Sequence, residues 1–210
     1  MTSAATSVAL CGIVEWGVAS RPFPGESESG DLHVVAPFEG GVLLGVIDGL
    51  GHGAEAAHAA RRAARVLSDA PSQPVRRLIE HCHVAMRSSR GAVMTIAVLD
   101  AKHDRLTWTA IGNVEGALWR AKSDNDPIRE AAVPRGGVVG YQLPSVRETV
   151  LPIARGDVLI LATDGIAHDF VLDSPLKRPA QGHAHDLLDR YGKDSDDALV
   201  LVVRYLGRSL

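Results

Sequence analysis

Aromatic residues are scarce in this chain of 210 residues: Phe, Trp and Tyr together make up 4% of it. Proteins that stack on nucleobases or sugar rings depend on such side chains, so these binding classes are disfavoured. The sequence also has no run rich in Lys or Arg, and its formal net charge is −3. The basic footprint by which proteins bind a phosphate backbone is therefore absent, and we expect no nucleic-acid partner.

Long apolar runs are missing too, and cysteines are few. No stretch reaches the roughly 20 apolar residues of a membrane span, and the N-terminus lacks the basic and apolar regions of a secretion signal. Cys11 and Cys82 are the only cysteines, and both lie among apolar residues. We expect a cytoplasmic protein with reduced thiols and no membrane partner. With 46% hydrophobic and 22% charged residues, the composition suits one globular domain over residues 1–210.

One further absence is local: no Lys or Arg lies between Arg21 and Arg61. Within this gap an apolar run ends in Asp48, a glycine-rich loop follows, and an alanine-rich helix pattern begins. A carboxylate at the end of a buried strand costs much desolvation free energy unless a cation meets it. Because no basic side chain is near in the sequence, a metal ion is a candidate counter-ion for Asp48.

Hydrophobic periodicity and turn residues predict a mixed α+β chain. Strands are expected at Val8–Ala19, Asp31–Phe38, Gly41–Asp48, Ala92–Leu99, Arg105–Ile111, Val114–Arg120, Arg147–Ile153, Val158–Ala162 and Ala198–Tyr205. Helices are expected at Gly53–Ala70, at Val75–Arg90 and, shorter, at His185–Tyr191, with 169–182 irregular. Glu39-Gly40 suits a tight hairpin, which would bring Asp31 and Asp48 together at one end of a sheet.

Carboxylates mark four of the predicted strand ends: Asp31, Asp48, Asp164 and Asp196, the last followed by Asp197. Oxygen ligands of this kind suit Mg²⁺ or Mn²⁺, whereas Zn²⁺ usually takes Cys or His. Without metal, such acids raise one another's pKa values. With two metal ions about 4 Å apart they support phosphoryl transfer. The spacing of these acids along the chain allows this chemistry.

Five motifs follow one another along the chain: SGD at 29–31, VIDGLGHG at 46–53, GGVVG at 136–140, RGDVLILATDGI at 155–166 and DDALVLVV at 196–203. In this order they resemble the metal-dependent protein phosphatases of type 2C, especially the bacterial branch that includes the sporulation stage II phosphatase. The resemblance covers nearly the whole chain. In length, and in lacking a sensor domain, the chain is most similar within that branch to the RsbX-type feedback phosphatases of the stressosome.

The resemblance implies an α-β-β-α sandwich, in which two antiparallel sheets face each other, helices lie outside, and a metal site lies at one end. It implies two Mn²⁺ or Mg²⁺ ions. Asp48 would bridge both ions, and the carbonyl of Gly49 would bind one of them. Asp164 and Asp196 would each hold one ion, and Asp31 would act through a bound water. The implied reaction is hydrolysis of phosphoserine or phosphothreonine by a metal-bridging hydroxide.

The implied substrate is a phosphorylated regulatory protein of bacterial stress signalling, either a stressosome scaffold or a protein of the anti-anti-sigma type. A monomeric enzyme is expected. Arg21 lies in the loop that holds a phosphate-clamping arginine in some eukaryotic relatives, but not at the matching distance, so metals alone would hold the phosphate. The rival hypothesis is a catalytically inactive pseudophosphatase that binds a partner protein. Retention of every core acid disfavours it.

Other features of the sequence have alternative interpretations. Gly49, Gly51 and Ala54 formally fit a dinucleotide-binding fingerprint, but a second helix follows where that motif requires a strand. His52 is open between a catalytic acid and a residue that flanks the start of the helix. The sequence His81-Cys82-His83 suggests a soft-metal site, although adjacent helical positions point in different directions, which favours helix packing.

Several charged or titratable residues receive simpler interpretations. His183 and His185 are expected to be solvated loop residues, and Asp157 is expected to stabilise a turn. A solvated helix face is the favoured interpretation of Arg61, Arg62 and Arg65. Docking of an acidic partner on those arginines is the less favoured alternative.

Overall fold

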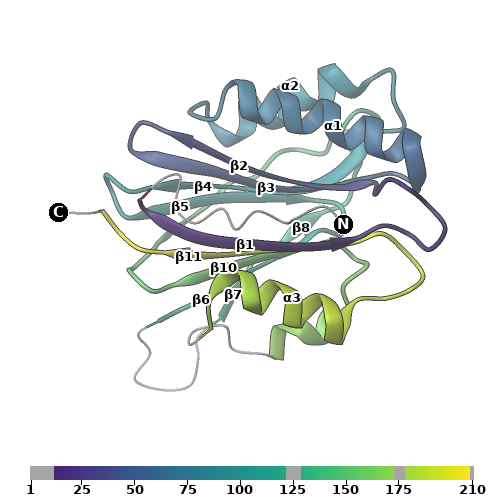
Figure 1. Cartoon of the computed structure of the whole chain (residues 1–210). Coiled ribbons are helices and arrows are strands. Elements are labelled where there is room, and N and C mark those ends of the chain that lie inside the picture. The colour runs from purple at the N-terminus through teal and green to yellow at the C-terminus, as the bar shows by residue number, and fades with distance from the viewer. Residues whose placement is uncertain (1–11, 122–128, 173–177, 209–210) are drawn as a thin grey trace.

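The structure is a computed structural model that describes residues 12–121, 129–172 and 178–208 (Figure 1). Its strands are β1 (Val14–Arg21), β2 (Asp31–Phe38), β3 (Gly41–Gly49), β4 (Ala92–Asp100), β5 (Arg105–Ile111), β6 (Glu115–Trp119), β7 (Arg129–Ala131), β8 (Pro134–Arg135), β9 (Thr149–Pro152), β10 (Val158–Ala162) and β11 (Ala198–Tyr205). Its helices are α1 (Gly53–Asp69), α2 (Val75–Met86) and α3 (Ala180–Tyr191), with a 3₁₀ turn, η1, at His168–Leu172.

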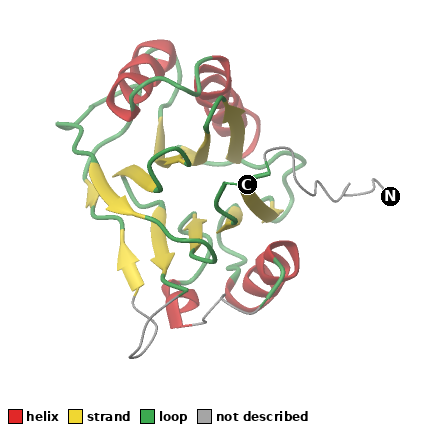
Figure 2. Ribbon diagram, turned by 90° about the vertical axis from the view of Figure 1, so that its left-hand side faces the viewer, coloured by secondary structure: helices red, strands yellow, loops and turns green. Residues whose placement is uncertain are grey.

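The strands form two sheets that face each other. One has the order β1-β11-β10-β6-β7, and the other has the order β2-β3-β4-β5-β8, with β9 also paired to β5. Among the described strands every pairing is antiparallel except the two-residue pairing of β5 with β8. Helices α1 and α2 cover the sheet that contains β3, and α3 covers the sheet that contains β11 (Figures 1 and 2). The predicted α-β-β-α sandwich is confirmed.

The layers follow from the alternation of side chains along the two central strands. In β3, Leu44 and Val46 point into the space between the sheets, whereas Ile47 packs in the core under α1 and α2. In β11, Leu201 faces the space between the sheets and Val200 faces α3. Both strands are buried on both sides, which explains why their sequences are continuous apolar runs rather than alternating ones.

Small side chains let α1 lie close to its sheet. The face that it buries includes Ala56, Ala60, Ala63, Ala64 and Leu67. The hairpin of β2 and β3 is also as predicted, with Gly40 at φ +83° in its turn and Phe38 paired with Gly41. A two-residue hairpin fixes the register of the two strands. This register places Asp31 directly opposite Asp48.

Helix α3 begins five residues earlier than predicted. Pro179 precedes its first turn and Gly182 lies within that turn, and both are poor residues for a helix interior. The turn is fixed by Gln181, whose side-chain amide donates a hydrogen bond to the Val18 carbonyl at 2.8 Å and accepts one from the Val18 N–H at 3.2 Å. A long-range contact with β1 therefore decides where the helix starts.

Other boundaries differ for local reasons. Helix α2 ends at Met86 rather than at Arg90, because the Ser89 hydroxyl donates a hydrogen bond to the Met86 carbonyl at 2.7 Å and closes a turn there. Strand β1 continues to Arg21, and the part of the predicted strand before residue 12 lies outside the described residues. The short strands β7 and β8 were not predicted. Within the described ranges, no helix is both long and apolar enough to cross a membrane.

Candidate active site

The strand ends at one end of the sandwich bring the predicted carboxylates together. Asp31 opens β2 and lies opposite Asp48 near the end of β3. In the other sheet, Asp164 follows the end of β10, and Asp196 precedes the start of β11. Strands β10 and β11 are antiparallel neighbours in that sheet. Since the sheets face each other, the two pairs of acids meet at the same end of the molecule. The charges of Asp164 and Asp196 reach Asp48 and help to raise its pKa.

An open cavity of about 350 Å³ lies between these strand ends and contains three of the four acids, Asp48, Asp164 and Asp196. The other lining residues are Phe23, Leu50, Gly51, His52, Val93, Asn113, Val138 and Ser195. None of these described lining residues is Lys or Arg. Asp31 does not line the cavity and is buried, with 5% of its surface exposed.

Burial and mutual repulsion raise the pKa values of these acids. The pKa of Asp48 rises to about 7, first through burial and then through the charges of Asp164, Asp196 and Asp197. Burial, followed by the charge of Asp48, raises the pKa of Asp31 to about 8. The pKa of Asp164 is raised by burial and by Asp196, although Lys193 opposes the shift. The acids of the cavity therefore carry an excess of negative charge, which a divalent cation would offset.

The donor chemistry of this cavity fits Mg²⁺ or Mn²⁺, because both ions prefer carboxylate and carbonyl oxygens. Among the described residues, however, no three acidic, His or Cys side chains already stand at the spacing of a formed metal site. Asp48, Asp164 and Asp196 border the cavity instead. The assignment of Asp31, Asp48, Gly49, Asp164 and Asp196 as metal ligands stays a prediction.

Two hydrogen-bonding residues that orient the acids were missed in the sequence. The Thr163 hydroxyl donates to Asp31 Oδ2 at 2.7 Å and accepts from the Leu199 N–H at 2.9 Å, which ties one sheet to the other. Asn113 Nδ2 donates to Asp164 Oδ2 at 2.6 Å. Thr163 precedes the Asp-Gly pair of its motif, and Asn113 lies in the turn between β5 and β6. Their neighbours lie far away in the sequence, so no local pattern reveals these bonds.

Asp197 anchors the loop that leads into β2. Its carboxylate is 3% exposed and accepts hydrogen bonds from the backbone N–H of Phe23 at 2.8 Å and of Gly30 at 3.0 Å. The backbone at Asp197 passes so close to Gly165 that a Cβ at position 165 would lie 1.9 Å from the Asp197 carbonyl oxygen. Only glycine fits there. A Cβ on Gly49 would likewise lie 2.2 Å from the carbonyl oxygen of Ala56 in α1.

Arg21 does not reach the cavity as a phosphate clamp. Its guanidinium pairs with Asp194 at 3.0 Å and donates a hydrogen bond to the Lys193 carbonyl at 3.0 Å. Lys193 was not singled out in the sequence, yet its Nζ donates to the Asp164 carbonyl at 2.6 Å. A cationic side chain thus stands beside the acids, held by the loop that Arg21 secures.

His52 fits both of its sequence interpretations. It occupies the extended position immediately before α1, at φ −133° and ψ 169°, and it also lines the cavity. Its ring stacks on Phe23 with 4.7 Å between centroids, and its Nδ1 lies 2.8 Å from Glu26 Oε1. These contacts hold the imidazole at the rim. A role as a catalytic acid stays a prediction.

The other histidines and cysteines considered in the sequence analysis have simpler structural explanations. The expectation that His183 is a solvated loop residue is wrong: it lies in α3 and is 1% exposed, because it faces the sheet side of the helix. His185 is exposed but is also helical. Cys82 is a buried free thiol in α2, while the neighbouring His83 accepts a hydrogen bond from the Gly140 N–H at 3.0 Å. These contacts support helix packing over a soft-metal site. Cys11 lies outside the described residues.

Comparison with known proteins supports the same family. The phosphoserine phosphatase RsbX of Bacillus subtilis (strain 168) is 25% identical over 144 residues, which are 68% of this chain and 69% of that protein. A solved structure described as "The bacterial stressosome: a modular system that has been adapted to control secondary messenger signaling" contains a chain that is 26% identical. It superposes with a TM-score of 0.82 and covers 91% of this chain and 99% of that one.

A crystal structure of RsbX in complex with magnesium superposes with a TM-score of 0.80 at 21% identity, covering 94% of this chain and 98% of that one. This similarity supports the fold of the two-sheet sandwich. The model of the family described as "Stage II sporulation protein E (SpoIIE)" matches residues 39–206. Because this match runs from the hairpin turn before β3 to the end of β11, the chain belongs to the Stage II sporulation protein E family.

Proposed function

We propose that this protein is a Mn²⁺- or Mg²⁺-dependent phosphatase that hydrolyses phosphoserine or phosphothreonine. The main support for this proposal is the cavity lined by Asp48, Asp164 and Asp196. None of its described lining residues is Lys or Arg. Divalent cations would neutralise this set of acids and would attract a phosphoryl group to it. Membership of the family, and similarity to a protein named phosphoserine phosphatase RsbX, support the proposal.

Asp48, Asp164, Asp196 and the carbonyl of Gly49 would hold the ions, with Asp31 acting through a bound water. Two such ions, when bound, supply an activated water nucleophile and neutralise charge on the phosphoryl group.

The supporting hydrogen bonds keep the acids in place. The Thr163 oxygen accepts from the Leu199 N–H, and its hydroxyl lies 2.7 Å from Asp31 Oδ2 against 3.4 Å from the Leu199 carbonyl, so Asp31 is the favoured acceptor of its proton. The amide of Asn113 holds one oxygen of Asp164 and leaves the other for a ligand. Hydrogen bonds of this kind matter because they fix the orientation of the side chains that would bind the metal ions.

The substrate we propose is a phosphorylated regulatory protein of bacterial stress signalling, of the stressosome scaffold or anti-anti-sigma type. Similarity to RsbX and to a chain from the bacterial stressosome study supports this choice. We propose that the chain acts as one catalytic domain and as a monomer. The cytoplasmic location expected from the sequence stays a prediction.

The decisive experiment measures hydrolysis of p-nitrophenyl phosphate and of a phosphoserine peptide with Mn²⁺, with Mg²⁺ and with a chelator. Wild type should turn over only with metal. Asp48→Asn should lower kcat by roughly 10³-fold or more, because several kcal/mol of transition-state stabilisation depend on the bound ions. Asp69→Asn is the matched control, since it makes the same chemical change on the exposed surface of α1.

A folded wild-type protein that shows no turnover with either metal, and no change in melting temperature on adding them, would contradict the proposal. The alternative would then be a pseudophosphatase that binds a partner without hydrolysis. Capture of phosphorylated against unphosphorylated peptide would be the next measurement in that case.

A further inference from the structure

Charge is unevenly distributed between the α1–α2 layer, residues 53–90, and the rest of the protein. This layer contains three acidic residues, no lysine and seven arginines, so its net charge is +4, whereas the whole chain carries −3. The arginines are Arg61, Arg62, Arg65, Arg76, Arg77, Arg87 and Arg90. An overall acidic protein therefore presents one basic layer.

Most of these arginines are available to a partner. All are exposed except Arg62, which is half-buried. Within the described structure, the guanidinium groups of Arg77 and Arg87 have no hydrogen-bond or ion-pair partner. Arg61 pairs with Glu28 at 3.1 Å, but both side chains are about half exposed, so an incoming carboxylate can compete for it.

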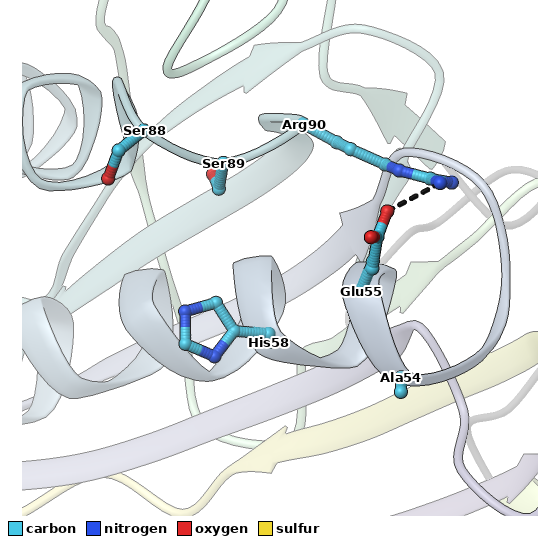
Figure 3. Close-up of a pocket in the computed structure, with 6 residues that line it drawn as sticks. All are labelled: Ala54, Glu55, His58, Ser88, Ser89 and Arg90. Atoms are coloured by element: carbon cyan, nitrogen blue, oxygen red, sulfur yellow. Dashed lines mark ion pairs between the residues drawn. The ribbon is translucent and has the colours of Figure 1, made fainter.

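A groove of about 420 Å³ opens in this layer, between the first turns of α1 and the loop that follows α2 (Figure 3). Its lining residues are Ala54, Glu55, His58, Ser88, Ser89 and Arg90. Figure 3 shows Arg90 reaching across the groove to Glu55, with 2.5 Å between their charged groups. Hydroxyl, imidazole and guanidinium groups thus border the groove, and these can all donate hydrogen bonds to carboxylates.

The groove lies next to the active-site cavity. Gly51 lines the cavity, and a Cβ added to it would lie 2.8 Å from Arg90 Nη1, which reaches over from the groove. His52 lines the cavity, and Ala54, two residues further on, lines the groove. An extended peptide with its phosphorylated residue in the cavity would therefore lay its flanking residues along Arg90 toward Arg87.

We propose that the groove and the arginines around it bind an acidic segment beside the phosphorylated residue of the protein substrate. This inference rests on the proposed phosphatase function and adds a substrate class to it: phosphoproteins whose phosphosite is flanked by Asp or Glu. Charge complementarity of this kind sets specificity and association rate more than raw affinity. Arg90 exchanges its partner Glu55 for a substrate carboxylate, and Arg87 gains a partner.

The test compares two synthetic phosphoserine peptides of equal length, one with Asp and Glu beside the phosphoserine and one with Asn and Gln in their place. The readout is the ratio of kcat/KM for the acidic peptide to kcat/KM for the neutral peptide, with Mn²⁺ present. Wild type should favour the acidic peptide, and Arg87→Glu/Arg90→Glu should lower the ratio about tenfold, because two attractions become repulsions. The preference should weaken above 0.15 M salt, where screening acts over about 8 Å.

Arg155→Glu/Arg208→Glu is the matched control, because it makes the same change of charge with two exposed arginines outside the basic layer. Its ratio should equal that of wild type. Equal kcat/KM values for the two peptides with wild type, or the same loss in the control variant, would overturn the proposal. If reversal of Arg90 beside Glu55 prevents folding, Arg87→Glu alone tests the same inference, since the Arg87 guanidinium has no partner in the described structure.

A binding measurement separates this inference from the proposed activity. Fluorescence anisotropy of the labelled acidic peptide, without phosphate and with chelator present, reports docking alone. Binding that is lost in Arg87→Glu, in a protein that never hydrolyses p-nitrophenyl phosphate, would support the groove and contradict the phosphatase. Normal hydrolysis of p-nitrophenyl phosphate, with identical binding of acidic and neutral peptides, would overturn the groove and leave the phosphatase standing.

Discussion

Buried carboxylates at the two ends of the sandwich have opposite surroundings. At the end away from the cavity, Asp157 is 1% exposed and pairs with the guanidinium of Arg120 at 3.0 Å. It also accepts hydrogen bonds from the N–H groups of Ala121 at 2.8 Å and Ala154 at 3.0 Å. At the cavity end, Asp31 is nearly as buried but faces another carboxylate, Asp48, across the strand pair.

Less buried acids differ in the same way. Burial raises the pKa of Asp100, but hydrogen bonds from His103 and from the Lys102 N–H outweigh it, and the net shift is downward. The pKa of Asp164 at the cavity end is instead raised by burial and by Asp196. One end is therefore electrostatically complete as soon as the chain folds. At the other end, the negative charge is offset only when cations bind from solution. The acids there lower the stability of the metal-free protein, and they provide a binding site for metal ions.

The largest expected effect is a difference in stability between Asp157→Asn and Asp31→Asn in metal-free protein. Asp157→Asn should lower the free energy of unfolding by about 3 kcal/mol, because it breaks a buried ion pair and leaves Arg120 partly uncompensated. At pH 8.5, above the pKa of about 8 that Asp31 has in the folded chain, Asp31→Asn should leave stability unchanged or raise it, because it removes a repelling charge. Urea unfolding with chelator present measures both. Equal destabilisation by the two substitutions would contradict the distinction between the ends.

Metal ions should raise the stability of the folded protein only by binding at the cavity end. At a Mn²⁺ concentration 100 times the Kd, wild type should gain about 2.7 kcal/mol of stability by mass action. Asp157→Asn should gain the same amount from its lower starting point, whereas Asp48→Asn should gain little. Melting temperatures with Mn²⁺ and with chelator give the comparison. A gain that survives Asp48→Asn would place the ions elsewhere in the protein.

The sequence predicted the incomplete end better than the complete one. Asp31 and Asp48 were expected to meet because a two-residue hairpin fixes their register, and they do. Asp164 and Asp196 were placed at strand ends by apolar runs that are easy to recognise. Each of these inferences depends only on residues a few positions apart, which is why the strand ends could be predicted without the structure.

The partners that complete or orient the acids could not be predicted. Asp157 was expected to stabilise a turn, and its N–H does bond to the Ala154 carbonyl at 3.0 Å, but its ion pair with Arg120 spans 37 positions. The bond from Thr163 to Asp31 spans 132 positions and joins opposite sheets. Such contacts depend on how the two sheets face each other, which hydrophobic periodicity leaves open.

The smallest expected effect is the pH dependence of the metal-free protein. Asp48 and Asp31 have pKa values of about 7 and about 8 in the folded chain, raised from 3.8, so the native state keeps protons that the unfolded state has lost. Stability should therefore fall as pH rises through these values, by roughly 2 kcal/mol between about pH 6.5 and 8.5. Burial lowers the pKa of His33, which gives the opposite slope below about pH 6.5, so the window begins there.

Two variations of this pH series sharpen the comparison of the two ends. Asp31→Asn should flatten the upper part of the slope, near pH 8, because that group no longer titrates. Saturating Mn²⁺ should flatten the whole slope, because the ions replace the protons on the same carboxylates. Melting temperature followed across the window, with and without Mn²⁺, is the measurement. Stability that stays level or rises from pH 6.5 to 8.5 in chelator would mean that the acids at the cavity end are already compensated within the chain, as those at the opposite end are.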